Sequence, residues 1–221
     1  MDRSRLGSCR LLVAVFVSLV AVLPATGCVH QMLATMIYVW SGPSVPASYE
    51  GLEGKRVVVY CRAPSSIEYR HATAAHDLSK RVASLLEINV ANIDVASPRD
   101  VEKWVNESDR EEFADLASAL DADMVVHIDM EQFGLEKGAT LYQGDADIVL
   151  TVYDMEQSGK IMWEKPLGQI LFPVNSAVPK QDKSLRQFHR QFIEMLAQQI
   201  ARHFYPHDPH ADFAIDATAH R

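Results

Sequence analysis

The segment DADMVVHIDMEQF, residues 121–133, constrains the fold most strongly, because the spacing of its apolar residues changes from helical to extended. Before it, Leu116 and Leu120 lie four positions apart, as on one face of a helix. Within it, Ile128 and Met130 alternate with polar residues, and successive side chains of a strand point to opposite faces. The segment therefore predicts a helix that leads into a strand with one apolar and one polar face.

The same alternation returns in GDADIVLTVYD, residues 144–154, and a glycine-containing turn follows it. We therefore expect residues 147–167 to form a β-hairpin. Further strands are expected at 56–61 and 88–95, and helices at 71–87, 98–106, 108–120 and 184–204. This order predicts an α/β fold in which a mixed sheet of four to five strands is covered mainly on one face by helices, the last of them a C-terminal amphipathic helix.

Several of these positions match a recurrent pattern, in which an alanine-rich helix runs into an Ala-Asp-x-Val-Val strand and the next strand ends in Asp before a Gly-Lys turn. The pattern resembles that of bacterial envelope lipoproteins, a group that includes the curli-secretion lipoprotein, the penicillin-binding-protein activator lipoproteins and the amino-terminal domain of the Tol-system propeller protein. The resemblance covers roughly residues 55–204 and implies an α/β domain used for assembly and binding, without catalytic residues. The residues that carry it are Ala122, Asp123, Val125, Val126, Asp154, Gly159, Lys160 and Trp163.

The amino-terminal segment predicts export. Three arginines precede an apolar run of 13 residues at 11–23, which suits a signal peptide and is too short to span a bilayer. The run ends in LPATGC, where Ala25 and Gly27 are the small residues that a signal peptidase needs before Cys28. LPATG also occurs in sortase signals, but those precede an apolar stretch near the carboxyl end. We expect cleavage between Gly27 and Cys28 and lipidation of Cys28, although Ala25 replaces the usual lipobox leucine; a plain secreted protein or an uncleaved anchor is the alternative.

These boundaries divide the chain into a signal peptide at 1–27, a lipid-anchor site and linker at 28–54, an α/β domain at 55–205 and a disordered, histidine-containing tail at 206–221. The whole chain carries a formal charge of −8. Removal of the signal takes away three arginines and one aspartate, which makes the remainder more acidic. An acidic domain repels phosphate, so a nucleic-acid partner is not expected.

The polar strand face is the candidate binding surface. His127 and Asp129 share this face, and Thr151 and Tyr153 of the neighbouring strand could meet them. A solvated face is the favoured interpretation; an acid–base pair or, with Asp145 and Asp147, a cation site are the less favoured ones.

Other histidines and the cysteine have plain interpretations. His71 and His76 lie five residues apart, which separates them on a helix. The cluster of His203, His207 and His210 with Asp208 and Asp212 is interrupted by prolines, so a solvated tail is favoured over adventitious metal binding. Cys61 is expected to be a small buried residue. No GxSxG, P-loop, GxGxxG or HExxH motif occurs, and no cofactor or metal is expected.

The sequence thus predicts a non-enzymatic, lipid-anchored envelope protein that binds or assembles another envelope component. Outer-membrane anchoring, facing the periplasm, is preferred because Val29 is not the aspartate of an inner-membrane retention signal. The alternatives are a secreted metal-dependent hydrolase that uses His127, Asp129, Asp145 and Asp147, or a structural oligomer of a secretion apparatus.

Overall fold

A computed structural model describes residues 44–107 and 113–208. The chain divides after Ser44, and the elements below belong to the unit that begins at Val45. Residues 1–43, and with them the predicted signal peptide, Gly27 and Cys28, lie outside the described residues. Within the described residues, no helix is both long and apolar enough to cross a bilayer.

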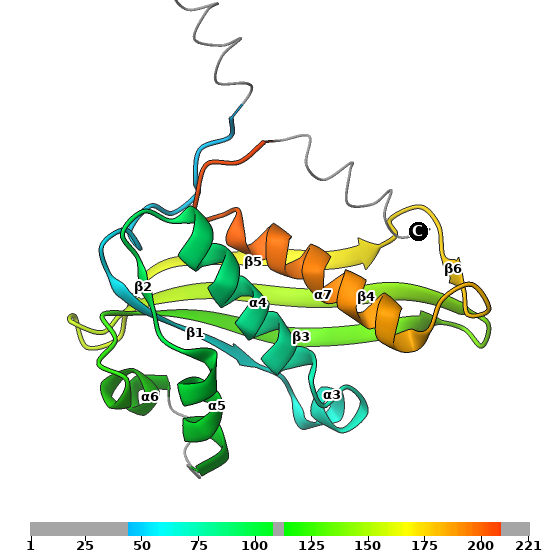
Figure 1. The fold of residues 1–221 in the computed structure, drawn as a ribbon, viewed down its shortest axis with the longest axis horizontal. Helices are drawn as coiled ribbons and strands as arrows, with labels where there is room; N and C mark the ends of the chain where they lie inside the picture. Colours follow the sequence, from blue (N-terminus) through cyan, green and yellow to red (C-terminus); the bar gives the residue numbers. More distant parts are fainter. Residues whose placement is uncertain (1–43, 108–112, 209–221) are drawn as a thin grey trace, which may run out of the picture. The chain divides into compact units, whose positions relative to one another are not determined.

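A mixed β-sheet forms the centre of the unit, in the order β2-β1-β3-β4-β5 (Figure 1). β1 pairs in parallel with β2 and β3, whereas β3, β4 and β5 pair antiparallel. The α/β class with a mixed sheet is therefore confirmed; a short sixth strand, β6, extends it by pairing with the start of β4. The strands are β1 (Arg56–Arg62), β2 (Asp94–Val95), β3 (Met124–Lys137), β4 (Leu141–Asp154), β5 (Lys160–Phe172) and β6 (Val178–Pro179).

The helices cover the two faces of the sheet unequally. The two longest, α4 and α7, run side by side over one face, where the main core lies (Figure 1). The shorter α5 and α6 pack against the opposite face, where Val58 of β1 contacts Val101 and Leu116 in a second, smaller core. The helices are α3 (Ser65–Arg70), α4 (Ala74–Asn89), α5 (Pro98–Glu107), α6 (Phe113–Ala119) and α7 (Leu185–Ala201).

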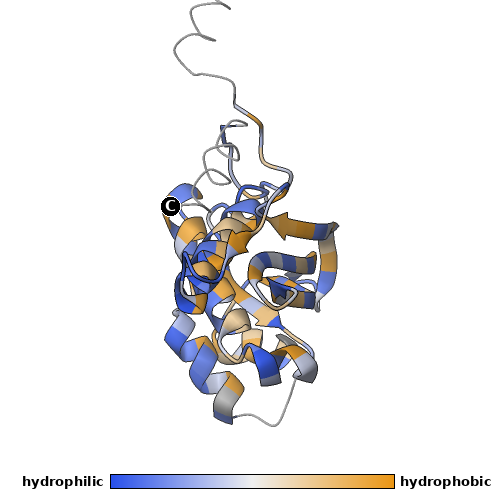
Figure 2. Cartoon of the chain, turned by 90° about the vertical axis from the view of Figure 1, so that its right-hand side faces the viewer, coloured by the Kyte–Doolittle hydropathy of each residue, from blue (hydrophilic) through white to orange (hydrophobic). Residues whose placement is uncertain are grey.

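Apolar side chains that alternate along the strands contribute to these two cores. Strands in Figure 2 show successive apolar and polar bands, as period-two patterning requires. Val126, Ile128 and Met130 are fully buried beneath the long helices, together with Leu150 and Val152 of β4. The core strip predicted from the sequence is therefore confirmed, because the side chains that alternate inward are the ones that the long helices bury.

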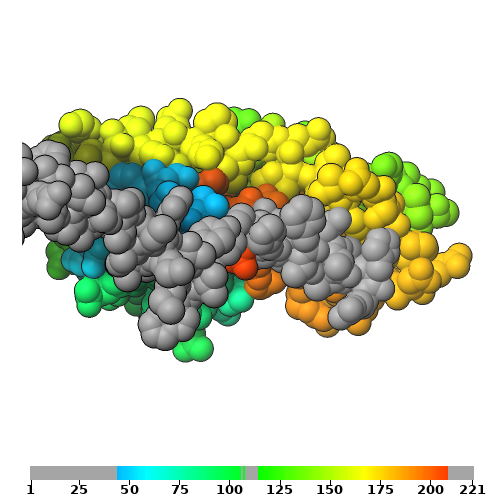
Figure 3. Space-filling view, turned by 90° about the horizontal axis from the view of Figure 1, so that it is seen from above, coloured from blue at the N-terminus to red at the C-terminus, as the bar shows by residue number. Residues whose placement is uncertain are grey.

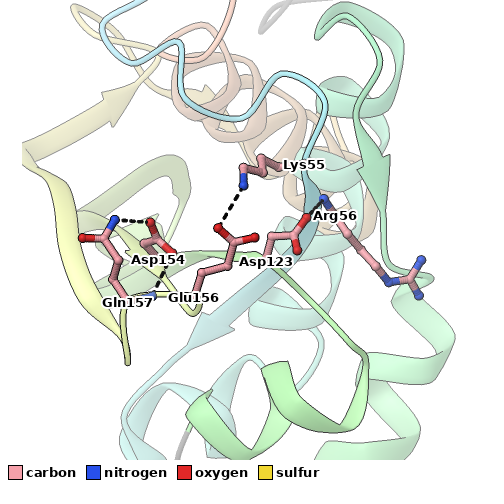
Figure 4. A network of polar contacts seen from close by, with 6 residues as sticks. All are labelled: Lys55, Arg56, Asp123, Asp154, Glu156 and Gln157. Carbon is pink, nitrogen blue, oxygen red and sulfur yellow. Dashed lines mark hydrogen bonds and ion pairs between the residues drawn. The ribbon is translucent and has the colours of Figure 1, made fainter.

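Two of the residues that carry the lipoprotein resemblance, Asp123 and Asp154, hold strand ends together (Figure 4). An Asp123 carboxylate oxygen accepts a hydrogen bond of 2.8 Å from the backbone N–H of Arg56, at the start of β1. The Asp154 carboxylate accepts bonds from the backbone and side-chain amides of Gln157, which close the turn between β4 and β5. Gly159 completes that turn with a φ of 77°, a conformation that favours glycine. These side chains are architectural, as the resemblance implies.

Several predicted boundaries differ from the observed ones. The helix expected from His71 begins at Ala74, because His71 ends α3 instead, and it continues to Asn89. The second strand, expected over 88–95, is reduced to Asp94–Val95 because its first residues belong to α4. Ser184 caps α7 with a full capping box to Gln187, at the position where the helix over 184–204 was expected to begin. The first residues of the helix expected over 108–120, residues 108–112, lie outside the described residues, and α6 is described from Phe113.

Backbone hydrogen bonds join residues 45–49, near the beginning of the described chain, to residues 203–207, near its end; we call this pairing the clip. Val45 and His207 form an antiparallel bridge with N–H to carbonyl distances of 2.9 and 3.0 Å. The backbone N–H groups of Ser48 and Tyr49 both donate to the carbonyl of His203. Tyr49 also packs against the main core. Residues before Lys55 and after Pro206 therefore pair with each other in the described structure.

Candidate binding face of the sheet

The four residues predicted as a binding face are brought together by the strand register. His127 lies directly opposite Thr151, and Val125 opposite Tyr153. Because alternate residues share a face, His127, Asp129, Thr151 and Tyr153 all lie on the face away from α4 and α7.

The expectation that this face is solvated is wrong for its inner part. His127 and Thr151 are only 7% and 5% exposed. The Tyr60 and Tyr153 rings flank His127 on this face, and α5 and α6 cover the part of the face around Val58 of β1. The side chains of His127 and Thr151 are thus buried beneath this face and are not exposed on it.

Aromatic rings surround the buried histidine. Tyr60 of β1 stacks against His127 at 5.7 Å between ring centroids, and the Tyr153 ring lies at 6.2 Å. Burial lowers the pKa of His127; nearby Asp129 opposes this shift and Arg62 adds to it. The imidazole is therefore neutral at pH 7 and serves as a packing group between two tyrosines.

Asp129 is held by a residue that the sequence analysis did not single out. The Arg62 guanidinium donates to the Asp129 carboxylate at 3.0 Å, and the Arg62 side chain is half exposed. Arg62 and Tyr60 pair with Asp129 and His127 across β1 and β3. The alternation of β1 places both on this face, but only the register shows which residues they meet.

Beyond this ion pair, the face is open over β3, β4 and β5. Of the described helices, α4 and α7 pack on the other side and α5 and α6 near β1. In register, Glu164 lies opposite Thr151 and Gln169 opposite Asp147. We call this surface the open face; its residues are at least partly exposed, and its polar members are accompanied by the apolar Val149, Ile161, Pro166 and Leu171. The polar members are Asp129, Asp145, Asp147, Tyr153, Glu164 and Gln169.

The carboxylates considered for acid–base or metal chemistry also lie on the open face. Asp145 accepts hydrogen bonds from the side-chain amides of Gln132 and Gln169, at 3.0 to 3.1 Å. Among the described residues, no three histidine, cysteine, aspartate or glutamate side chains converge as a metal site would need. His127, Asp129 and Asp145 are thus engaged in packing, an ion pair and amide hydrogen bonds, and the arrangement presents an acidic, hydrogen-bonding surface.

The remaining histidines are dispersed. His203 accepts or donates a 3.0 Å hydrogen bond with Ser48, and its ring lies 5.8 Å from that of Trp163. His71 and His189 pack edge-on against Phe133, whereas His76 lines a cavity beside β1. His203 and His207 belong to the clip between the chain ends; His210 and Asp212 lie outside the described residues.

Cys61 is buried, as predicted, at the end of β1. Burial, with a smaller effect of Asp129, raises the pKa of its thiol. The thiol is therefore protonated at neutral pH and poorly nucleophilic.

Comparison with known proteins gives distant structural likenesses. No protein-family model matches the chain, and no curated protein matches it in sequence. The PelC dodecamer from Paraburkholderia phytofirmans is 12% identical, with 74% of this chain and 96% of that chain covered and a TM-score of 0.44. Lipoprotein GNA1162 from Neisseria meningitidis is 15% identical, with 66% and 97% covered and a TM-score of 0.40. The LpoB C-terminal domain from Salmonella enterica is 14% identical, with 53% and 83% covered and a TM-score of 0.36.

Solved structures of lipoproteins occur among these distant matches. At these identities the likeness concerns the arrangement of helices and strands alone.

Proposed function

We propose that the chain is an exported, non-enzymatic envelope protein, anchored through a lipid on Cys28, and that its open face binds another envelope protein. One observation carries the second part: three long strands bring Asp129, Asp147 and Glu164 onto one surface that the described helices leave uncovered. The first part rests on the signal-like amino terminus and the cysteine after Gly27. Outer-membrane anchoring, facing the periplasm, remains the preferred destination.

The chemistry of the open face indicates the kind of partner. The residues that define the open face include the carboxylates of Asp129, Asp145, Asp147 and Glu164 and no lysine or arginine, and the neighbouring Arg62 guanidinium pairs with Asp129. A partner surface with lysine or arginine would complement this charge, which speeds encounter and favours the correct partner.

Self-association through the sheet edge is less well supported. β5, yellow in Figure 3, lies at the edge of the sheet with Ile161 half exposed. However, β5 contains Pro166, and its pairing with β4 is interrupted at two irregularities. Proline and bulges are features by which edge strands avoid pairing with another chain, so the open face is the better candidate.

Site-specific photo-crosslinking in intact cells tests the binding face. A photo-reactive amino acid at exposed Glu164 should yield a defined crosslinked protein, whereas the same group at Glu87, exposed on α4, should not. Replacing Asp147 and Glu164 with lysine should reduce partner capture, and Glu87→Lys should leave it unchanged. Equal crosslinking from both positions, or none from Glu164, would contradict this role of the open face.

The anchor is tested separately. Cys28→Ser should move the protein from the membrane fraction to the soluble fraction, because serine lacks the thiol that would carry the lipid and the acyl chains are what anchor a lipoprotein. Unchanged partitioning would refute lipidation at Cys28, and mass spectrometry of the amino-terminal peptide would show whether acyl groups are present.

A further inference from the structure

The outer edge of β1 is only partly covered by its neighbour. β2 pairs with β1 at Arg56 and Val57 alone, and the last hydrogen bond runs from the Ala96 N–H to the Val57 carbonyl, at 2.9 Å. The chain then turns into α5 at Pro98, whereas β1 continues to Arg62 beside β3. Among the described elements, no strand lies beside residues 59–62 on this side of β1.

The backbone groups of two residues point to that uncovered side. In a strand, successive residues direct their N–H and C=O groups alternately to the two neighbours. The carbonyls of Lys55 and Val57 accept hydrogen bonds from the β2 side, from the N–H groups of Asp94 and Ala96. By the same alternation, the N–H and C=O groups of Val59 and Cys61 point away from β3 and toward the uncovered side.

A cavity of about 270 Å³ lies along this stretch of edge. We call it the β1 slot; it is lined by residues 59–62 of β1, by Ala75 and Ser79 of α4 and by Val101 and Glu102 of α5. The small side chains of α4 leave room for a backbone to approach β1. Four residues of strand would span about 13 Å at 3.3 Å per residue.

The charges around the slot favour a cation. Its ionisable lining groups are Arg62, Glu68, His76 and Glu102. Arg62 is paired with Asp129 at 3.0 Å, and Glu68 and Glu102 are exposed. The carboxylates of Glu68 and Glu102 are therefore available to a ligand in the slot, whereas the charge of the Arg62 guanidinium is already compensated by Asp129.

We propose that the β1 slot binds an extended peptide of a partner protein, which adds to the sheet beside Val59 and Cys61 and places a lysine or arginine near Glu68 and Glu102. Addition of a strand to a sheet edge combines main-chain hydrogen bonds, which give affinity, with side-chain pockets, which give specificity. Small apolar side chains on either side of the basic residue suit Ala75 and Val101. This site is separate from the open face and does not depend on it.

The probe is a blocked heptapeptide of alternating alanine and valine with a central lysine, titrated by fluorescence anisotropy onto the full chain in detergent. We expect binding to weaken about tenfold or more when the central lysine becomes glutamate, or when alternate peptide nitrogens are methylated. Charge reversal of Glu68 and Glu102 to lysine should invert the preference between the lysine and glutamate peptides.

A plugging variant and its neighbour provide the matched control. Ser79→Phe, inside the slot, should abolish binding, whereas Lys80→Phe, on the exposed side of the same helix, should retain it. The open-face variant Glu164→Lys should also retain it, which separates failure of this proposal from failure of the proposed function.

Three results would overturn the proposal. No binding of the lysine peptide at about 1 mM would show that the slot takes no such strand. Binding unchanged by N-methylation would indicate a side-chain or small-molecule pocket. Binding unchanged by Ser79→Phe would place the peptide elsewhere. If circular dichroism shows that Ser79→Phe is unfolded, the charge-reversal pair decides.

Discussion

Replacing Gly144 of β4 with alanine tests how closely α7 packs on the sheet. A Cβ at this position would lie 2.6 Å from Cδ2 of Phe192 and 2.7 Å from two further ring atoms. Ordinary van der Waals contacts between carbon atoms lie at about 3.5–4.0 Å. The ring or the strand would therefore have to move by roughly 1 Å.

The Phe192 ring has little room to move. It is fully buried, and it packs between Phe133 at 5.4 Å and Phe172 at 6.2 Å, measured between ring centroids. Overpacking of this kind costs about 1–3 kcal/mol, while the loss of glycine's freedom in the unfolded chain returns about 0.4–1 kcal/mol. We expect Gly144→Ala to lower the free energy of unfolding by about 1–2 kcal/mol, which lowers Tm by about 2–8 °C.

Urea unfolding of the full chain in detergent, followed by circular dichroism, measures the effect. Gly134→Ala on the neighbouring strand β3 is the matched control, because its Cβ would meet only the Asp145 carbonyl oxygen at 3.9 Å. Phe192→Leu combined with Gly144→Ala should be less destabilised than the sum of the single variants, since the smaller side chain relieves the clash. Equal stability of the Gly144 and Gly134 variants would refute the close packing of α7 against β4.

Three further predictions concern the cap of α7, the clip and the buried thiol. Ser184→Ala removes the capping box and should cost about 1 kcal/mol in urea unfolding, whereas Ser184→Thr should cost much less; equal losses would contradict a capping role. Burial is the chief cause that lowers the pKa of His203 to about 4 in the folded chain. Between about pH 6.5 and 4 the imidazole is therefore protonated in the unfolded chain and neutral in the folded chain, and the free energy of unfolding should fall as the pH falls. His71, His127 and His189 act in the same direction, and His203→Gln should flatten the slope by at most about 1.4 kcal/mol per pH unit; an unchanged slope would argue against a shifted pKa at His203. Because burial raises the pKa of Cys61, iodoacetamide at about pH 8 should leave it unmodified in the folded chain and alkylate it in denaturant, as peptide mass mapping would show; rapid labelling of the folded chain would refute its burial.

Local features of the sequence anticipated most of the elements. Alternation over 124–131 and 147–153 predicted β3 and β4, the Gly159 turn predicted the β4–β5 hairpin, and Ser184 predicted the start of α7. Each of these signals depends on side chains within a few residues of one another. The errors fell where local signals compete: Ile88 and Val90 fit either a strand or the end of a helix, and α4 extends to Asn89.

The candidate site was only half predictable for the same reason. Because alternate residues of a strand share a face, the sequence placed four residues on one face of β3 and β4, and the register confirms this placement. They are His127, Asp129, Thr151 and Tyr153. The alternation of side chains along a strand does not predict which other elements cover a face of the sheet. That the Tyr60 ring would stack on the buried His127 depends on β1 lying beside β3 in this register.

By itself, then, the sequence determined the order of elements, the apolar strip of the sheet and the signal-like segment that ends at Cys28, because helical and extended periodicities and turn residues act over short distances. Only the tertiary structure decided the rest. Arg62 meets Asp129 across 67 residues of chain, Val45 pairs with His207 at the far end, and β2 stops after two residues and leaves the β1 slot. Such pairings depend on which long loops close and which surfaces then fit, and no local pattern encodes that choice.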